Sequence, residues 1–267
     1  MTAQATSAPP SVRTGFVPAA PAPIHPPPRP RVSVVIPALD EEQNIGWVLR
    51  RMPDSVDEVI VVDGLSRDAT IEVARMILPQ VVIVHEMNPG KGNALRAGFE
   101  AATGDVVVMI DADGSMDPAD IPSFLDAIAA GHDVAKGSRF ASSVAGSDDI
   151  SWLRMWGNAG LLLVANLLYR TRHTDLCYGF VAFRKEALRV IRADASGFEI
   201  EMQLVARATR ARLRVVEVAN HEHARMNGTS NLRTVRDGWR VLMTLLGELR
   251  WRPTEDRMTI EEPATLR

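Results

Sequence analysis

Two aspartates separated by a single residue follow a run of aliphatic side chains at positions 106–110. They are Asp111 and Asp113, and because side chains alternate along an extended chain, both carboxylates point to the same side. Two such carboxylates repel each other unless a cation lies between them, and their hard oxygen atoms suit Mg²⁺ or Mn²⁺. The pattern predicts a divalent metal site at this pair. The competing interpretation is that the two aspartates cap the following helix.

Acidic residues follow two further aliphatic runs in the first half of the chain. Asp40 and Glu41 come shortly after one run, and Asp63 closes another. In open parallel sheets, ligands bind beyond the carboxyl ends of the strands, where acidic groups suit a metal, a ribose or a base edge. For Asp40, as for Asp68, capping of the next helix explains the residue equally well.

A glycine-rich turn at positions 89–94, Pro-Gly-Lys-Gly-Asn-Ala, leads into an expected helix. Its glycines permit a close approach of the backbone, and Lys91 could meet a phosphate or a sugar hydroxyl. The turn lacks the spacing of a Walker motif, so it is not a P-loop. The alternative is an ordinary turn with a lysine that faces solvent.

Aliphatic runs alternate with helical patterns in the first half, which predicts βαβ units and a mostly parallel sheet with right-handed crossovers. The expected strands are 32–37, 58–64, 81–85 and 106–110, and the expected helices between them are 41–51, 69–78 and 92–102. The expected elements of the second half are helices at 121–130, 151–170, 199–210 and 237–250, a helix that begins at Ala182, and a strand at 214–218. We therefore predict an α/β fold with one catalytic domain.

Composition divides the chain into three parts. Residues 1–30 are rich in Pro, Ala, Ser and Thr. Such a segment cannot bury enough apolar surface to offset its ordering entropy, so we expect a disordered tail. The folded domain is expected at 31–252 and a frayed polar end at 253–267.

Charge and cysteine content exclude several classes of protein. The net charge of −3 over 267 residues gives no indication of nucleic-acid binding, so an anionic ligand has to be held by local basic groups. Cys177 is the single cysteine, which rules out an intramolecular disulfide and fits a reducing cytosol. The sequence shows no signal-peptide pattern and no uncharged apolar run of about 18 residues, so no spanning helix is expected.

The expected helix at 151–170 is strongly apolar, contains two tryptophans and is interrupted by Asn158 and Asn166. It is too short and too polar to cross a bilayer. It could instead lie in the membrane interface, with its tryptophans at headgroup depth. The competing interpretation is a core helix, or one that packs on the helix at 239–249 or on another subunit.

Six stretches of the chain combine these features in one order: VSVVIPALDEEQNI, EVIVVDGLSRDAT, NPGKGNALRAGFEAATGDVVVMIDADGSMDP, KGSRF, TDLCYGFVAFRKEAL and GFEIEM. With a later RMNGTS they extend from Val32 to Ser230. In these motifs the chain resembles family 2 glycosyltransferases of the GT-A fold, and most of all the dolichol-phosphate mannose synthase-like branch. The resemblance implies a Rossmann-like, mostly parallel sheet flanked by helices.

The resemblance also implies roles on the donor side of the site. The residues implied to line the nucleotide pocket are Pro37, Ala38, Asp40 and Glu41. Glu41 would lie near the ribose, Asp63 would hydrogen-bond the base, and Lys91 would lie near the sugar-nucleotide. Asp111 would lie near the ribose and the metal, and Asp113 would bind the metal directly.

Three arginines match basic residues of the family. Arg225 corresponds to a group near the donor diphosphate, and Arg139 and Arg154 correspond to groups that hold an acceptor phosphate. The chain departs from the family at three positions. Ser115 replaces a glutamine that touches the metal in relatives, Val181 replaces an arginine, and Asn231 replaces a lysine.

These roles imply a metal-dependent, inverting transfer of a hexose from a nucleotide sugar of the GDP-mannose or UDP-glucose type to a polyprenyl phosphate. The expected partners are the nucleotide sugar, the lipid phosphate and a membrane surface that contacts residues 151–170. The expected location is the cytoplasm or the cytoplasmic face of the membrane. An oligomer is compatible with the sequence.

Other functions remain open. A soluble hydroxyl acceptor would need a carboxylate to take its proton, and the candidates are Asp148, Asp149, Glu199 and Glu201. His221 and His223 are either a third metal ligand, a base, or ordinary surface side chains. A nucleotide-sugar-binding protein without turnover is a further alternative, against which the intact acidic and basic motif residues argue.

Overall fold

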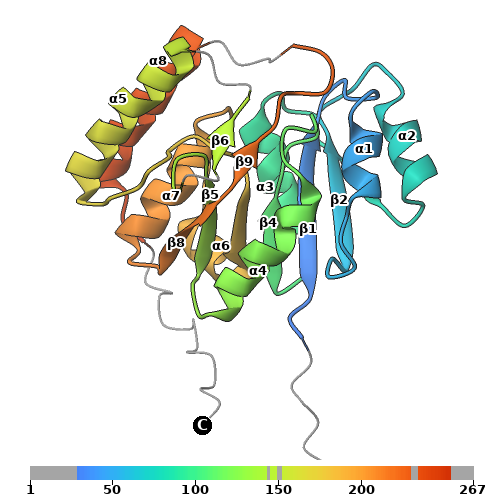
Figure 1. Cartoon of the computed structure of the whole chain (residues 1–267), viewed down its shortest axis with the longest axis horizontal. Helices are drawn as coiled ribbons and strands as arrows, with labels where there is room; N and C mark the ends of the chain where they lie inside the picture. Colours follow the sequence, from blue (N-terminus) through green and yellow to red (C-terminus); the bar gives the residue numbers. More distant parts are fainter. Residues whose placement is uncertain (1–28, 143–144, 149–151, 230–233, 254–267) are drawn as a thin grey trace, which may run out of the picture.

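A seven-stranded sheet in the order β3-β2-β1-β4-β7-β5-β8 forms the centre of the computed structural model (Figure 1). The structure describes residues 29–142, 145–148, 152–229 and 234–253. The tails expected at the two ends therefore lie almost wholly outside the described residues. The α/β fold predicted from the sequence is confirmed.

The first four strands are parallel and follow the four aliphatic runs. Their bounds are β1 Val32–Ala38, β2 Glu58–Asp63, β3 Val82–His85 and β4 Val106–Met109. Ala38 pairs with Asp63, and Val35 pairs with Met109. This register brings the carboxyl ends of β1, β2 and β4 to one edge, so the acidic residues that follow them share that edge.

The second half of the sheet corrects the sequence interpretation. The helix expected to begin at Ala182 is instead strand β7 (Val181–Arg184), followed by helix α6 (Lys185–Ile191). β7 is antiparallel to both neighbours, β4 and β5 (Val134–Ser138), and β5 pairs in parallel with β8 (Val215–Ala219). β5 was not expected from the sequence. Both strands are buried between others, and pairing with distant segments decides their conformation.

Helices cover both faces of the sheet (Figure 1). One apolar cluster joins the sheet to α1 (Ile45–Arg50), α2 (Thr70–Ile77) and α4 (Ile121–Ala129). The cluster on the other face joins it to α3 (Lys91–Ala101), α6 and α7 (Ile200–Arg210). The helix expected from residue 41 begins only at Ile45, because the residues before it form a turn in which the Glu41 carbonyl accepts hydrogen bonds from Asn44 and Ile45.

Two long helices pack together at one end of the molecule: α5 (Trp152–Tyr169) and α8 (Thr234–Gly247) (Figure 1). A third apolar cluster, which includes Ala165, Met202 and Leu245, holds this pair against α7. The Tyr169 hydroxyl donates to the carbonyl of Leu245 at 2.6 Å. Among the described helices, none combines the length and apolarity that crossing a bilayer requires.

The remaining elements are short. Two 3-10 turns span Pro118–Asp120 and Glu248–Arg250. A separate two-stranded sheet pairs β6 (Gly146–Ser147) with β9 (His221–Glu222) in parallel. It joins the connection between β5 and α5 to the chain that follows β8.

Candidate functional site

The two aspartates predicted to bind a metal lie where the chain turns after β4. Gly114, between Asp113 and Ser115, has a φ of +79°, which favours glycine, and a Cβ there would lie 2.8 Å from the Met226 side chain. The backbone N–H of Ser115 donates to Asp113 Oδ1 at 2.9 Å and fixes the orientation of that carboxylate.

Each aspartate is paired with a cation from another part of the chain. Lys91 Nζ lies 2.5 Å from Asp111 Oδ1 and 2.6 Å from Glu201 Oε1. Arg225 Nη2 lies 2.7 Å from Asp113 Oδ2, and its Nη1 lies 3.1 Å from Glu41 Oε1. Residues from five distant segments therefore meet at the edge of the sheet.

The carboxylate pair fits a divalent ion. Asp111 and Asp113 line one pocket together with Lys91 and Arg225. Burial raises the pKa of Asp111 above its ordinary value; Lys91 only partly offsets this effect, and Asp113 adds repulsion. A cation between the two carboxylates would relieve that repulsion, and their oxygens are the ligands that Mg²⁺ and Mn²⁺ prefer.

Arg225 has a free donor that suits an anionic ligand. Its Nε is buried and has no hydrogen-bond partner within the described part of the chain. A buried donor without a partner costs free energy, which an oxygen of a bound diphosphate would recover. Burial also raises the pKa of Glu41 above its ordinary value, although Asn44 and Arg225 oppose the change.

The glycine-rich turn approaches another segment of the backbone. A Cβ on Gly92 would lie 2.2 Å from the carbonyl oxygen of Ala195, and the N–H of Gly92 donates to the carbonyl of Ser196 at 2.9 Å. The close approach that its glycines permit is therefore to the chain that precedes α7. The same packing brings Lys91, the first residue of α3, to Glu201 on α7.

Arg139 lies in the wall of the pocket but is already paired. Its Nε and Nη2 donate to the two carboxylate oxygens of Asp175 at 2.7 and 2.9 Å, and its Nη1 donates to Glu222 at 3.0 Å. Nη2 also donates to the carbonyl of Cys177 at 2.9 Å. These four bonds use four of the five N–H groups of a guanidinium. An acceptor phosphate would have to use the remaining group or displace Glu222.

Among the carboxylates considered as a base, Glu201 lines the pocket, where it pairs with Lys91. Glu199 pairs with Arg240 at 2.9 Å, and Asp148 is exposed and pairs with His221. Asp149 and the side chain of Arg154 lie outside the described residues, so their predicted roles stay predictions.

The residues implied for base and ribose binding lie along the adjoining strand ends. Asp63 is buried, accepts a hydrogen bond from the N–H of Ser66 at 3.1 Å, and lies 3.3 Å from His85 Nδ1. Asp40 Oδ1 accepts from the N–H of Arg67 at 2.7 Å, so it braces the loop after β2. Pro37 and Ala38 end β1. The nucleotide-binding roles of these residues stay predictions.

Sequence reasoning missed several polar side chains that line the pocket or lie behind its wall. Asp175 and Glu222 hold Arg139, and Asn158 of α5 reaches Asp175 through its amide at 3.3 Å. Asn158 Oδ1 is buried and has no partner among the described residues, so it is available to a ligand hydroxyl. The block TDLCYGF carried the signal for Asp175, since an aspartate stands inside a stretch that resembles the family.

Comparison with known proteins shows the family to which the chain is similar. The family model described as "Glycosyl transferase family 2" matches residues 33–192. A dolichol-phosphate mannosyltransferase from Pyrococcus furiosus is 33% identical over 214 residues, which cover 76% of this chain and 59% of that relative. The chain thus spans less than two thirds of that protein. An undecaprenyl-phosphate mannosyltransferase from Micrococcus luteus is 33% identical over 203 residues, 70% of this chain and 82% of the relative.

A solved structure is similar over most of the fold. It is glucosyl-3-phosphoglycerate synthase from Mycobacterium tuberculosis in complex with Mn²⁺, uridine diphosphate and glucosyl-3-phosphoglycerate. The TM-score is 0.66 at 25% sequence identity, and the alignment covers 85% of this chain and 82% of the other.

Proposed function

Because the chain belongs to glycosyltransferase family 2 and has the GT-A fold, it is a hexosyltransferase, and we propose that it transfers its hexose to a polyprenyl phosphate. The proposed donor is a nucleotide sugar of the GDP-mannose or UDP-glucose type. We further propose that the transfer inverts the anomeric carbon and requires Mg²⁺ or Mn²⁺ at Asp111 and Asp113. Relatives of the family that were crystallised with Mn²⁺ or Mg²⁺ and uridine diphosphate support a divalent cofactor in the family.

The donor end of the reaction is governed by the leaving diphosphate. Negative charge grows on the leaving oxygen, so groups that stabilise this charge lower the barrier. The Nε of Arg225 has no partner among the described residues and would donate to the diphosphate. The Nη2 of the same side chain pairs with Asp113. A divalent ion, when bound, supplies Lewis-acid stabilisation of the same charge. Lys91 holds Asp111 in place through their ion pair.

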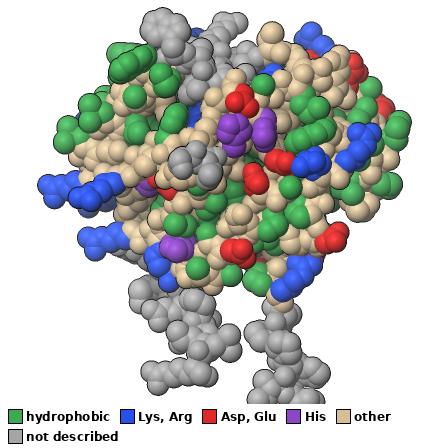
Figure 2. All heavy atoms as spheres, viewed as in Figure 1, with side chains coloured by type: hydrophobic (Ala, Val, Ile, Leu, Met, Phe, Trp, Pro, Cys, Tyr) green, Lys and Arg blue, Asp and Glu red, His purple; other side chains and the backbone are tan. Residues whose placement is uncertain are grey.

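One observation carries the lipid-phosphate proposal: the two helices that wall the pocket expose apolar side chains on their outer side. Gly157 and Leu161 of α5 and Val241 of α8 line the pocket. The exposed apolar residues of the same helices are Met155, Trp156, Leu163, Leu167, Trp239, Met243 and Leu246. Figure 2 shows hydrophobic side chains gathered at the upper left, over this helix pair.

This arrangement suits an acceptor whose phosphate enters the pocket while its chain stays in a bilayer. Trp156 is 67% exposed, Leu167 is 77% exposed and Trp239 is 63% exposed. Tryptophans favour the headgroup region of a membrane, and aliphatic side chains gain free energy from burial in its acyl boundary. A phosphate monoester oxygen is anionic near neutral pH, so its attack needs little help from a base.

A soluble phosphorylated acceptor is the second candidate. The solved synthase was crystallised with phosphoglyceric acid, and its acceptor class would place a hydroxyl in the pocket. Glu201 is the described candidate base that lines the pocket, although its pairing with Lys91 weakens it as a base. A panel of GDP- and UDP-sugars with undecaprenyl phosphate or phosphoglyceric acid separates the two acceptors. Turnover of the soluble acceptor alone would contradict the lipid-phosphate proposal.

The membrane contact makes a separate prediction. Trp156→Ser and Trp239→Ser should each weaken partition onto liposomes by about tenfold, because each removes a large apolar side chain from the interface. Cosedimentation with liposomes measures the effect. Met76→Ser is the matched control, since Met76 is 76% exposed but lies on α2, away from the helix pair. If all three variants sediment like the parent protein, or if the parent forms a dimer through these helices, the face does not contact a membrane.

The donor pocket makes another prediction. Asp63→Asn should raise the KM for the donor by roughly tenfold and change kcat little, because a uniform binding contact to the base is weakened. Asparagine keeps an oxygen for the N–H of Ser66, so the turn after β2 is preserved. Calorimetry with uridine diphosphate and guanosine diphosphate measures the affinity, and Asp54→Asn on an exposed loop is the control. An unchanged affinity would remove Asp63 from the donor site.

A further inference from the structure

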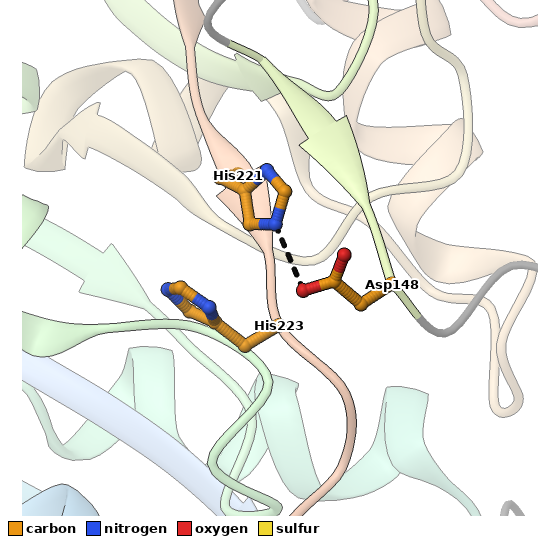
Figure 3. A group of neighbouring side chains, drawn as sticks. All are labelled: Asp148, His221 and His223. Atoms are coloured by element: carbon orange, nitrogen blue, oxygen red, sulfur yellow. Dashed lines mark hydrogen bonds and ion pairs between the residues drawn. The ribbon is translucent and has the colours of Figure 1, made fainter.

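Three potential metal ligands gather at the small β6–β9 sheet (Figure 3). One ligand atom each from Asp148, His221 and His223 lies within 4.8 Å of the others. His221 Nε2 lies 3.0 Å from Asp148 Oδ2, and the centroids of the two imidazole rings are 5.0 Å apart. Asp148 follows β6, and the histidines flank Glu222, the last residue of β9.

The cluster is distinct from the lining of the pocket that contains the two aspartates. Glu222 lines that pocket and holds Arg139 at 3.0 Å. Neighbours along a strand point to opposite sides, which separates the side chain of His221 from that of Glu222. His223 follows the strand, and its N–H donates to the carbonyl of Ser115 at 2.9 Å. None of the three cluster residues lines the pocket.

The small sheet leaves space for one of the rings. Gly146 pairs with His221 across the two strands, and a Cβ at position 146 would lie 2.9 Å from His221 Nδ1. A larger residue would therefore push the imidazole away from its present place. This packing keeps the ring beside Asp148.

We propose that Asp148, His221 and His223 form a second metal site, which binds a late first-row divalent ion of the Zn²⁺ class. Two imidazole nitrogens and one carboxylate oxygen suit Zn²⁺ far better than Mg²⁺, which prefers oxygen ligands only. Zinc ligands lie about 2.0–2.2 Å from the ion, so tetrahedral ligands lie roughly 3.4 Å from one another. Rotation of the side chains by about 1 Å closes the site, and their exposure permits it, since Asp148 is 57% and His221 is 38% exposed.

Such an ion would cross-link two segments that are 73 residues apart in the sequence. One segment is β6, in the connection between β5 and α5, and the other is β9. Glu222, which lies between the two histidines, bonds to Arg139 and to the Ser147 hydroxyl. An ion bound to Asp148, His221 and His223 would therefore stabilise the part of the pocket wall that Glu222 and Arg139 form. Because it binds the folded chain, it should also raise the melting temperature.

Binding of Zn²⁺ to the full chain without a polyhistidine tag tests the site. Titrations are followed by calorimetry in excess Mg²⁺, which occupies oxygen-only sites, and the visible absorption of Co²⁺ reports nitrogen ligands and a low coordination number. One equivalent of Zn²⁺ is expected to bind, and His221→Ala should weaken it by more than about 100-fold, since it removes a ligand. His223→Ala should do the same. The rise in melting temperature with Zn²⁺ should disappear in both variants.

Two controls separate this site from the other acidic groups. His85→Ala removes an exposed histidine that also neighbours an aspartate, Asp63, and it should leave Zn²⁺ binding unchanged. Asp113→Asn should likewise keep the Zn²⁺ equivalent. Equal binding by the parent protein and His221→Ala would overturn the proposal. Loss of the ion in Asp113→Asn would also overturn it, because the ion would then lie at the carboxylate pair.

Discussion

Asp113→Asn is expected to abolish hexose transfer while the protein stays folded. The substitution keeps the size of the side chain but removes the charge that would hold the divalent ion, and with it several kcal/mol of transition-state stabilisation. A loss of about 4 kcal/mol corresponds to roughly a thousandfold in kcat. Initial rates of nucleoside diphosphate release with Mn²⁺ measure the effect. Chelation of the metal should abolish the activity of the parent protein, and added Mn²⁺ should restore it.

The fold should tolerate this change, because Asp113 repels two neighbouring carboxylates, Asp111 and Glu41. Arg225 would keep its contact to Glu41 at 3.1 Å. Asp54→Asn on an exposed loop is the matched control and should behave like the parent protein. Near-normal turnover by folded Asp113→Asn would show that the carboxylate pair does not hold the catalytic metal.

The first half of the fold could be predicted because its signals are local. Each of β1, β2 and β4 contains a run of buried aliphatic residues, and such runs are recognisable in the sequence. The acidic residues that follow them then lie at one edge by the rules of parallel sheets. Asp111 and Asp113 could therefore be placed together before the structure was known.

The second half could not be predicted in the same way. β7 has only four residues, and its sequence runs directly into α6, so the helical pattern extends over both. The conformation of β7 depends on β4 and β5, which pair with it from distant parts of the chain. Local propensity does not contain that information.

The ion-pair partners of the charged site residues also could not be predicted from the sequence. Lys91 and Glu201 are 110 residues apart, and Glu41 and Arg225 are 184 residues apart. Motif resemblance indicated that Lys91 and Arg225 belong to the site, but only the packing of α3 against α7 shows that Lys91 bridges two carboxylates. For Arg139, the resemblance indicated a phosphate ligand, and only the structure shows that the buried Asp175 is its partner.

Arg139→Ala is expected to lower the free energy of unfolding by about 3–5 kcal/mol, which lowers the melting temperature by roughly 10 °C. The side chain of Asp175 is fully buried, and removal of Arg139 leaves its charge without compensation. Thermal and urea unfolding measure the change. Arg51→Ala is the control: Arg51 also makes a two-bond pair, with Asp117, but it is 43% exposed, so its removal should change the melting temperature little.

The pH dependence identifies the cause of this loss. Burial alone would raise the pKa of Asp175, but its hydrogen bonds to Arg139 hold that pKa below the ordinary value. In the parent protein the pair therefore adds stability at neutral pH, and this contribution is lost as the pH falls through the lowered pKa. Without Arg139, burial should raise the pKa of Asp175 instead, so the folded variant binds a proton more readily than the unfolded chain. The difference in stability between parent and variant should thus be largest near pH 7 and shrink towards pH 5. A difference that does not change with pH would mean that lost packing, and not the buried charge, is responsible.

The ion pair between Arg139 and Asp175 limits how a role of Arg139 in acceptor binding can be tested. Since Arg139→Ala perturbs folding, a loss of activity in that variant does not identify a phosphate contact. Arg139→Lys keeps a positive charge beside Asp175 but cannot make the paired contacts of a guanidinium, so it should lose less stability. Below its melting temperature, a raised KM for the acceptor with an unchanged donor KM would indicate a phosphate contact through the N–H that the described residues leave unused. If both KM values stay at those of the parent, Arg139 acts by holding Asp175 and Glu222, and the acceptor phosphate must be bound by other cations.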